Sequence, residues 1–186
     1  MTVFELLARK HGEIDALFSQ THDALAASRP DQARTWFDLL STNLIACMRA
    51  ENAVVYPRFA HLAGLEDEVI QAIREHDRIE QAVNHLRLVP LTQDAWQGAL
   101  TRLQVMVTNH VETEDWILFP VARLRLSTAE ATKIGEEFAA YEPIAASVAS
   151  PSITYDMEAR CDLEWRAPAP TRFETAPSTV LIEHAA

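Results

Sequence analysis

Seven residues with metal-binding side chains interrupt the apolar faces of four predicted helices. They are His11, Cys47, Glu51, His76, Glu80, His110 and Glu114. Six of them form pairs four residues apart, which places both members on one helix face. A buried carboxylate is costly unless it is paired or bound to a cation. Because imidazole and carboxylate together suit iron, manganese or zinc, the pattern favours a metal site.

Two of these residues, Glu51 and Glu114, also share a longer pattern. Each lies six residues before a proline, and in each case the first candidate ligand lies four residues before the glutamate. His11 precedes Glu51 by 40 residues and His76 precedes Glu114 by 38, so the two halves mirror one another. This predicts a duplicated helix pair about an approximate two-fold axis. Two bridging glutamates suit a pair of ions better than one.

The apolar periodicity predicts four long helices, over residues 3–27, 32–55, 65–88 and 92–119. Thr92 is a plausible N-cap of the fourth helix, and prolines close the second and fourth. Short connections favour an all-α, up-down-up-down antiparallel bundle. The candidate ligands then lie at one depth, roughly 9 to 16 Å from the same end.

The sequence divides into three predicted parts. Residues 1–125 form the bundle, and residues 126–142 form a short accessory helix that starts at a capping box and ends near Tyr141. Residues 143–186 form an extended, proline-containing tail, whose apolar residues predict packing on the bundle or on a neighbouring subunit. A homodimer joined through the tail is therefore one expectation.

The composition excludes several classes of function. A net charge of −11 and the lack of a basic run argue against nucleic acid and an anionic membrane surface as partners. No apolar run reaches the roughly 20 residues that a membrane span needs. Two cysteines make no disulfide framework, and a signal-peptide pattern is missing, so we expect a cytoplasmic protein.

The layout resembles the hemerythrin-like, HHE cation-binding domain over about residues 1–125. The resemblance is carried by His11, by Glu51 with Pro57, by Arg74-Glu75-His76, and by His110-Val111-Glu112-Thr113-Glu114 with Phe119-Pro120. It implies a non-haem di-iron centre in a four-helix bundle that binds or senses oxygen, nitric oxide or peroxide, or stores iron. It also implies that His11, His76 and His110 are terminal ligands and that Glu51 and Glu114 bridge.

Two positions depart from that family pattern. Cys47 stands where the family usually has a histidine, and three outcomes stay open: a thiolate ligand, a buried thiol beside an open coordination position, or a degraded centre with one ion or none. Glu80 stands where oxygen carriers tend to have a second histidine, and is either a ligand or a partner of an imidazole N–H. Asp115 is a possible substitute bridge for Glu114, and Asp15 could orient a histidine.

Three functions compete. The first is a di-iron protein that senses or handles oxygen, nitric oxide, peroxide or iron itself, although a single ion or another divalent metal is possible. Its centre would be enclosed by Phe18, Leu44, Val107 and Ile117. The second is a di-iron oxidoreductase acting on peroxide or nitric oxide. The third is a structural or dimerisation module with a degenerate metal site. The sequence leaves open whether the protein is an enzyme.

Overall fold

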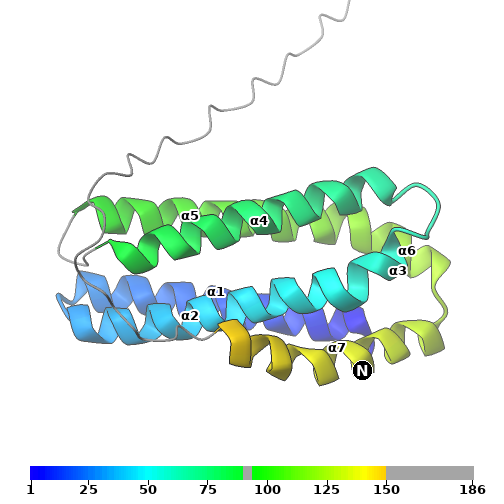
Figure 1. Ribbon diagram of the computed structural model, residues 1–186, viewed down its shortest axis with the longest axis horizontal. Coiled ribbons are helices and arrows are strands. Elements are labelled where there is room, and N and C mark those ends of the chain that lie inside the picture. Colours follow the sequence, from blue (N-terminus) through cyan, green and yellow to red (C-terminus); the bar gives the residue numbers. More distant parts are fainter. Residues whose placement is uncertain (90–93, 150–186) are drawn as a thin grey trace, which may run out of the picture. The chain divides into compact units, whose positions relative to one another are not determined.

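The computed structural model describes residues 1–89 and 94–149, which form helices joined by short connections, with no strand among them (Figure 1). The first helix is α1 (Val3–Ala26), and the third is α4 (Glu66–Leu88). The second is built of α2 (Pro30–Ala50), η1 (Glu51–Val55) and α3 (Tyr56–Phe59). The fourth is built of α5 (Asp94–Thr113), η2 (Glu114–Leu118) and α6 (Phe119–Arg125), and α7 (Thr128–Ala149) follows. The predicted all-α bundle is confirmed.

The helices pack as two antiparallel pairs that bury their apolar stripes against each other. The α1 and α2 helices form one pair, α4 and α5 form the other, and α7 lies along α1 and α2 (Figure 1). At the end of the bundle away from the metal-binding residues, the Trp96 ring packs edge-on against Phe37, with ring centroids 5.3 Å apart. The Trp96 indole N–H donates to the carbonyl of Leu86 over 3.0 Å, which ties α5 to α4.

The second and fourth helices do not end at their prolines, as the sequence predicted. Helix continues past Pro57 to Phe59 and past Pro120 to Arg125. In both cases a five-residue π-helical segment comes first, and the proline then lies in the first turn of the next α-helix. A proline is tolerated there because its missing N–H falls where the hydrogen-bond register changes from π to α.

The fifth helix is also longer than predicted, because it passes through Pro143 and ends at Ala149 rather than near Tyr141. Residues 143–149, predicted as the start of the tail, are therefore helical. Ala145 and Ala149 are both buried, and this packing offsets the cost of an internal proline. At its other end the helix approaches the N-terminus closely: a Cβ added to Gly135 would lie 2.9 Å from the carbonyl oxygen of Met1.

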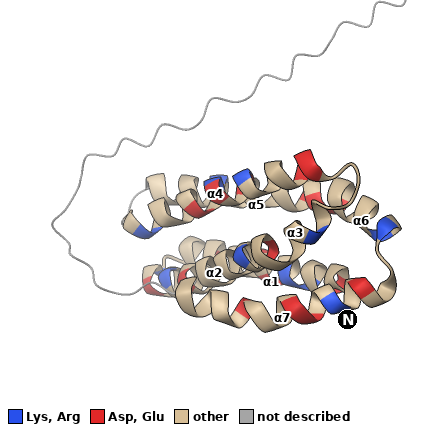
Figure 2. Cartoon of the chain, turned by 45° about the vertical axis from the view of Figure 1, so that its right-hand side comes forward, with Lys and Arg blue, Asp and Glu red and all other residues tan. Residues whose placement is uncertain are grey.

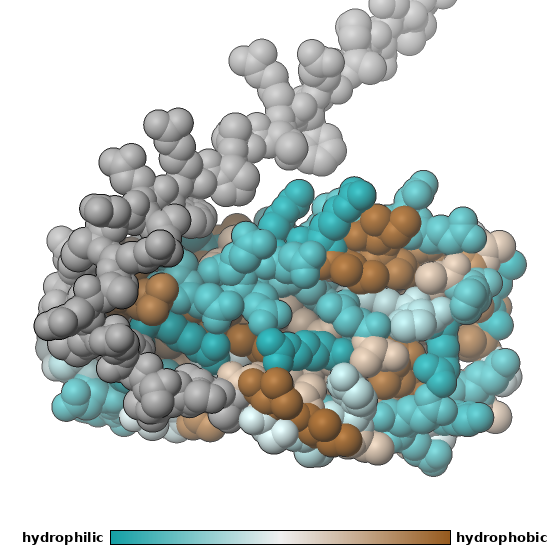
Figure 3. Space-filling model, viewed as in Figure 1, coloured by the Kyte–Doolittle hydropathy of each residue, from teal (hydrophilic) through white to brown (hydrophobic). Residues whose placement is uncertain are grey.

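The outer surface of the described helices is mixed in character. In Figure 2 the Lys and Arg residues are interspersed with Asp and Glu, and Figure 3 shows a largely hydrophilic face with apolar groups over α4 and α7. The exposed apolar residues of these two helices include Ile70 and Ile73 on α4 and Ile144 and Val148 on α7. None of the described helices is long and apolar enough to cross a bilayer. The predicted N-cap Thr92 and residues 150–186 lie outside the described residues, and the predicted limits of the three parts stay predictions.

Candidate metal centre

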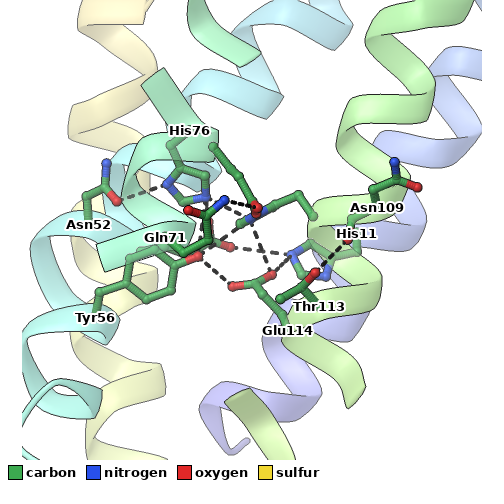
Figure 4. Close-up of polar contacts among 11 residues, drawn as sticks. His11, Asn52, Tyr56, Gln71, His76, Asn109, Thr113 and Glu114 are labelled. Atoms are coloured by element: carbon green, nitrogen blue, oxygen red, sulfur yellow. Dashed lines mark hydrogen bonds and ion pairs between the residues drawn. The ribbon is translucent and has the colours of Figure 1, made fainter. Parts of the chain in front are cut away.

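Six of the seven predicted residues meet in the middle of the bundle, and they come from all four long helices (Figure 4). One candidate group joins His11, Cys47 and Glu51, and a second joins Glu51, His76 and His110, with the ligand atoms of each group within 4.8 Å of one another. Glu114 completes the cluster, because its Oε2 lies 3.5 Å from His11 Nε2 and 3.7 Å from His110 Nε2.

The two glutamates occupy equivalent places, since each is the first residue of a π-helical segment. The backbone N–H of Tyr56 donates to the carbonyl of Glu51, and that of Phe119 donates to the carbonyl of Glu114, so each bond spans five residues. The repeated glutamate-to-proline spacing in the sequence is thus the signal of a repeated π segment. Such segments are rare and often lie at functional sites.

The π segment in the fourth helix changes which residues face the core. An extra residue in the turn rotates the rest of the helix by about 100° relative to an unbroken α-helix. Ile117, predicted to enclose the centre, is 46% exposed, whereas Leu118 is fully buried. That prediction was wrong because it assumed an uninterrupted 3.6-residue period through Glu114.

His76 and His110 point their Nε2 atoms at each other across 2.8 Å. His76 Nδ1 donates to Asn52 Oδ1 over 2.9 Å, and His110 Nδ1 donates to the Glu75 carboxylate over 3.0 Å. With the Nδ1 protons engaged in this way, both Nε2 atoms are left to present lone pairs in the form of the ring that binds a metal. Two lone pairs at this distance repel, and a cation to one side of the pair, bound by both nitrogens, would turn that repulsion into two coordinate bonds.

The half of the cluster around His11 and Cys47 is held by fewer hydrogen bonds. His11 Nε2 faces Glu51 Oε1 at 3.4 Å, while its buried Nδ1 has no hydrogen-bond partner among the described residues. The Cys47 thiol donates to Glu51 Oε1 over 3.3 Å. Burial and the adjacent Glu51 carboxylate raise the pKa of Cys47 well above its ordinary value, so the thiol is neutral in the absence of a cation.

The pKa values of the Glu51 and Glu114 carboxylates are shifted in opposite directions. Burial alone would raise the pKa of Glu51, but the adjacent imidazoles of His11 and His76 outweigh burial and hold it well below its usual range. Burial and the Glu51 charge raise the pKa of Glu114 to about 7, although nearby histidines and Tyr56 oppose the shift. Burial lowers the pKa of His11, but the Glu51 and Glu114 carboxylates outweigh it and raise the value to about 9.

Tyr56 is a member of the cluster that the sequence reasoning missed. Its side chain is fully buried, and its hydroxyl donates to Glu114 Oε1 over 2.7 Å. The same oxygen lies 3.3 Å from His76 Nε2 and 3.5 Å from His110 Nε2. The signal in the sequence was that Tyr56 lies five residues after Glu51. Residues five apart lie on the same side of a π turn, but they do not lie on the same side of an α turn.

Glu80, predicted as a ligand or as a partner of an imidazole, is neither. It accepts a hydrogen bond of 2.7 Å from Arg49, and both side chains are about one-third exposed. The buried positions of α4 follow a strict repeat of three and four residues: Val69, Ala72, His76, Ile79, Val83 and Leu86. Ile79 therefore takes the core position that the apolar pattern assigned to Glu80. Asp15 and Asp115 are exposed, which leaves Glu114 as the buried carboxylate of the fourth helix.

The donor set fits a metal centre. Nitrogen, oxygen and sulfur donors converge, and Glu114 Oε2 is buried without a hydrogen bond. Glu51 belongs to both candidate groups, and Glu114 lies near a histidine of each. The fold and the site together define a helical-bundle protein with a carboxylate- and imidazole-lined cation centre.

Comparison with known families agrees with this class. The model of the hemerythrin HHE cation-binding domain matches residues 2–122, and the chain belongs to that family. The resemblance noted in the sequence is thereby confirmed, and cation binding is the family's defining property. No solved structure matches significantly.

A curated relative is a DNA nickase from Nostoc sp. (strain PCC 7120 / SAG 25.82 / UTEX 2576). It is 21% identical over 140 residues, which are 75% of this chain and 39% of the relative. The chain thus spans about two fifths of the length of that protein.

Proposed function

We propose that the protein holds two iron ions in this centre and uses them to bind or sense a small ligand such as oxygen, nitric oxide or peroxide. The observation that carries the proposal is the facing pair of Nε2 atoms of His76 and His110, each with its Nδ1 proton already engaged. Imidazoles held in that way are fixed in the tautomer that a metal requires.

The mixture of donors supports iron. Imidazole nitrogen, carboxylate oxygen and a thiol are available together, and iron accepts all three. Glu51 and Glu114 each lie near both halves, as bridging carboxylates would. When bound, a pair of iron ions would supply the affinity for a diatomic ligand and the capacity to exchange electrons.

The burial of the cluster supports a small ligand. The His11 side chain is 11% exposed, and the other imidazoles and both glutamates are at most 5% exposed. A bulky substrate could not reach the cluster without unfolding part of the bundle, whereas a diatomic molecule or peroxide could approach along His11. The Tyr56 hydroxyl is a hydrogen-bond donor already inside the centre.

Metal analysis of the purified protein tests the first half of the proposal. Protein produced with added iron should contain close to two ions per chain, and Glu51→Gln should lose most of them. Glu80→Gln is the matched control, because it removes a carboxylate that pairs with Arg49 outside the cluster. Retention of iron by Glu51→Gln, or a wild-type protein without metal, would contradict the proposal.

Ligand binding is tested on the loaded protein. The anaerobic, reduced protein should change its visible spectrum on addition of oxygen, nitric oxide or peroxide. Catalytic consumption of peroxide with a reductant would move the assignment from a sensor to an oxidoreductase. A function on nucleic acid like that of the curated relative is not proposed, because the net charge is −11 and the basic residues of the described helices are interspersed with acidic ones (Figure 2).

A further inference from the structure

The two halves of the centre are related by position but differ in chemistry. His110 lies four residues before Glu114, and the residue four before Glu51 is Cys47. Tyr56 lies five residues after Glu51 and stacks near the His76 ring, with centroids 5.2 Å apart. Its counterpart after Glu114 is a phenylalanine, which stacks on His11 at 6.5 Å and carries no oxygen.

The half around His76 and His110 is held in place by hydrogen bonds. Each of its two imidazoles has an acceptor at Nδ1, Asn52 for one and Glu75 for the other. Glu75 is held in turn, because the Gln71 amide donates to its second oxygen over 2.8 Å. Groups that orient a metal-bound imidazole in this way commonly contribute 10- to 100-fold in metal affinity.

The half around His11 and Cys47 lacks these supports. It offers one imidazole where the other half offers two, and the buried Nδ1 of that imidazole has no acceptor among the described residues. The counterpart of Asn52 is Asp115, which follows Glu114 as Asn52 follows Glu51, and it is exposed. An ion there would have to orient the ring of His11 as it binds.

Resting on the proposed function, we propose that the two ion positions are unequal in affinity. The position formed by Glu51, His76 and His110, with the Tyr56 oxygen beside it, fills first and holds its ion. The position formed by His11, Cys47 and Glu51 fills second and exchanges its ion with solution. At equal concentrations of metal and protein, the protein therefore carries a single ion in the first position.

An anaerobic titration with Co²⁺ tests the proposal on the full chain, because cobalt reports its ligands in the visible and near-ultraviolet spectrum. We expect two phases whose dissociation constants differ by at least about tenfold. Any sulfur-to-cobalt charge-transfer band should grow only with the second equivalent. A single phase that fills both positions together, or a sulfur band that grows with the first equivalent, would overturn the proposal.

The mirrored histidines supply a matched pair of variants. His11→Ala should abolish the weaker phase and leave the tighter one, whereas His76→Ala should abolish the tighter one, with far-ultraviolet circular dichroism reporting the fold of both. Asn52→Ala gives a milder test that keeps every candidate ligand: the tighter phase should weaken by about 10- to 100-fold while Asp115→Ala leaves it unchanged. The reverse pattern in either pair would overturn the proposal. Failure of the wild type to bind cobalt would instead refute the proposed function itself.

Discussion

Replacing Glu114 by glutamine should stabilise the metal-free protein at alkaline pH. The side chain is fully buried, and burial together with the Glu51 charge raises its pKa from an ordinary 4.5 to about 7. At about 1.4 kcal/mol per pH unit, keeping this group ionised in the folded state costs about 3 kcal/mol. Glutamine has nearly the same shape and can still accept the Tyr56 hydroxyl. The attraction to His11 and His110 is already included in this figure. Because the amide group of glutamine must itself be buried, we expect a net gain of about 1 to 3 kcal/mol.

The pH dependence gives this prediction a distinctive form. The pKa of Glu114 is higher in the folded state than in the unfolded state. The free-energy cost of keeping its carboxylate ionised in the folded protein is therefore absent below about pH 4.5 and complete above about pH 7. Urea denaturation with a chelator present should therefore show Glu114→Gln more stable than wild type at pH 8, with the gap closing towards pH 5. A gain of this size corresponds to a thermal shift of about 2 to 4 °C per kcal/mol for a chain of this length.

Two control experiments separate this effect of Glu114 from other causes. Glu112→Gln removes an exposed carboxylate of the same helix and should leave the stability nearly unchanged. Adding a saturating divalent metal should reverse the order of wild type and Glu114→Gln, because an amide is a poorer bridging ligand than a carboxylate. A metal-free Glu114→Gln protein that is less stable than wild type at pH 8, or equally stabilised at pH 5, would refute the reasoning.

Three further predictions concern other parts of the molecule. In urea denaturation, Leu118→Ala should destabilise the protein by about 2 to 5 kcal/mol and Ile117→Ala by less than about 1 kcal/mol. The reason is that the π segment buries Leu118 and exposes Ile117. Equal effects of the two substitutions would contradict the π segment. Glu80→Gln should retain the wild-type affinity for Zn²⁺ in a calorimetric titration, whereas Glu51→Gln should lose it. Because the pKa of His11 is raised to about 9 in the folded state, the urea midpoint of the metal-free protein should fall as pH rises from 6.5 to 9, and bound Zn²⁺ should remove that fall.

The sequence placed the cluster at the right depth because long amphipathic helices make polar intrusions easy to see. His11, His76 and His110 each replace an aliphatic residue on an otherwise apolar stripe, and short connections left an antiparallel bundle as the natural arrangement. Depth along each helix then followed from the rise per residue, so the convergence of these three histidines at one level could be anticipated without coordinates.

The sequence misled where the helical period changes. Tyr56 was overlooked and Ile117 was assigned a core position for the same reason. Both predictions assumed the 3.6-residue period of an α-helix for residues that form a π turn. Glu80 failed for a different reason. From Val69, the buried stripe of α4 could continue either through Ile73 to Glu80 or through Ala72 to Ile79. In the folded bundle Ile79 is buried and Glu80 pairs with Arg49 of α2.

Several features that are costly for a folded chain occur in one place. Two π segments interrupt its helices, two imidazole nitrogens face each other, and Glu114 Oε2 is buried without a hydrogen bond. Each of these reduces the stability of the folded chain, and each lies at or beside an atom that a cation would contact. A shared cause is more economical than separate ones, because a bound cation would offset all three at once. Folding stability and metal occupancy should therefore rise together in this protein.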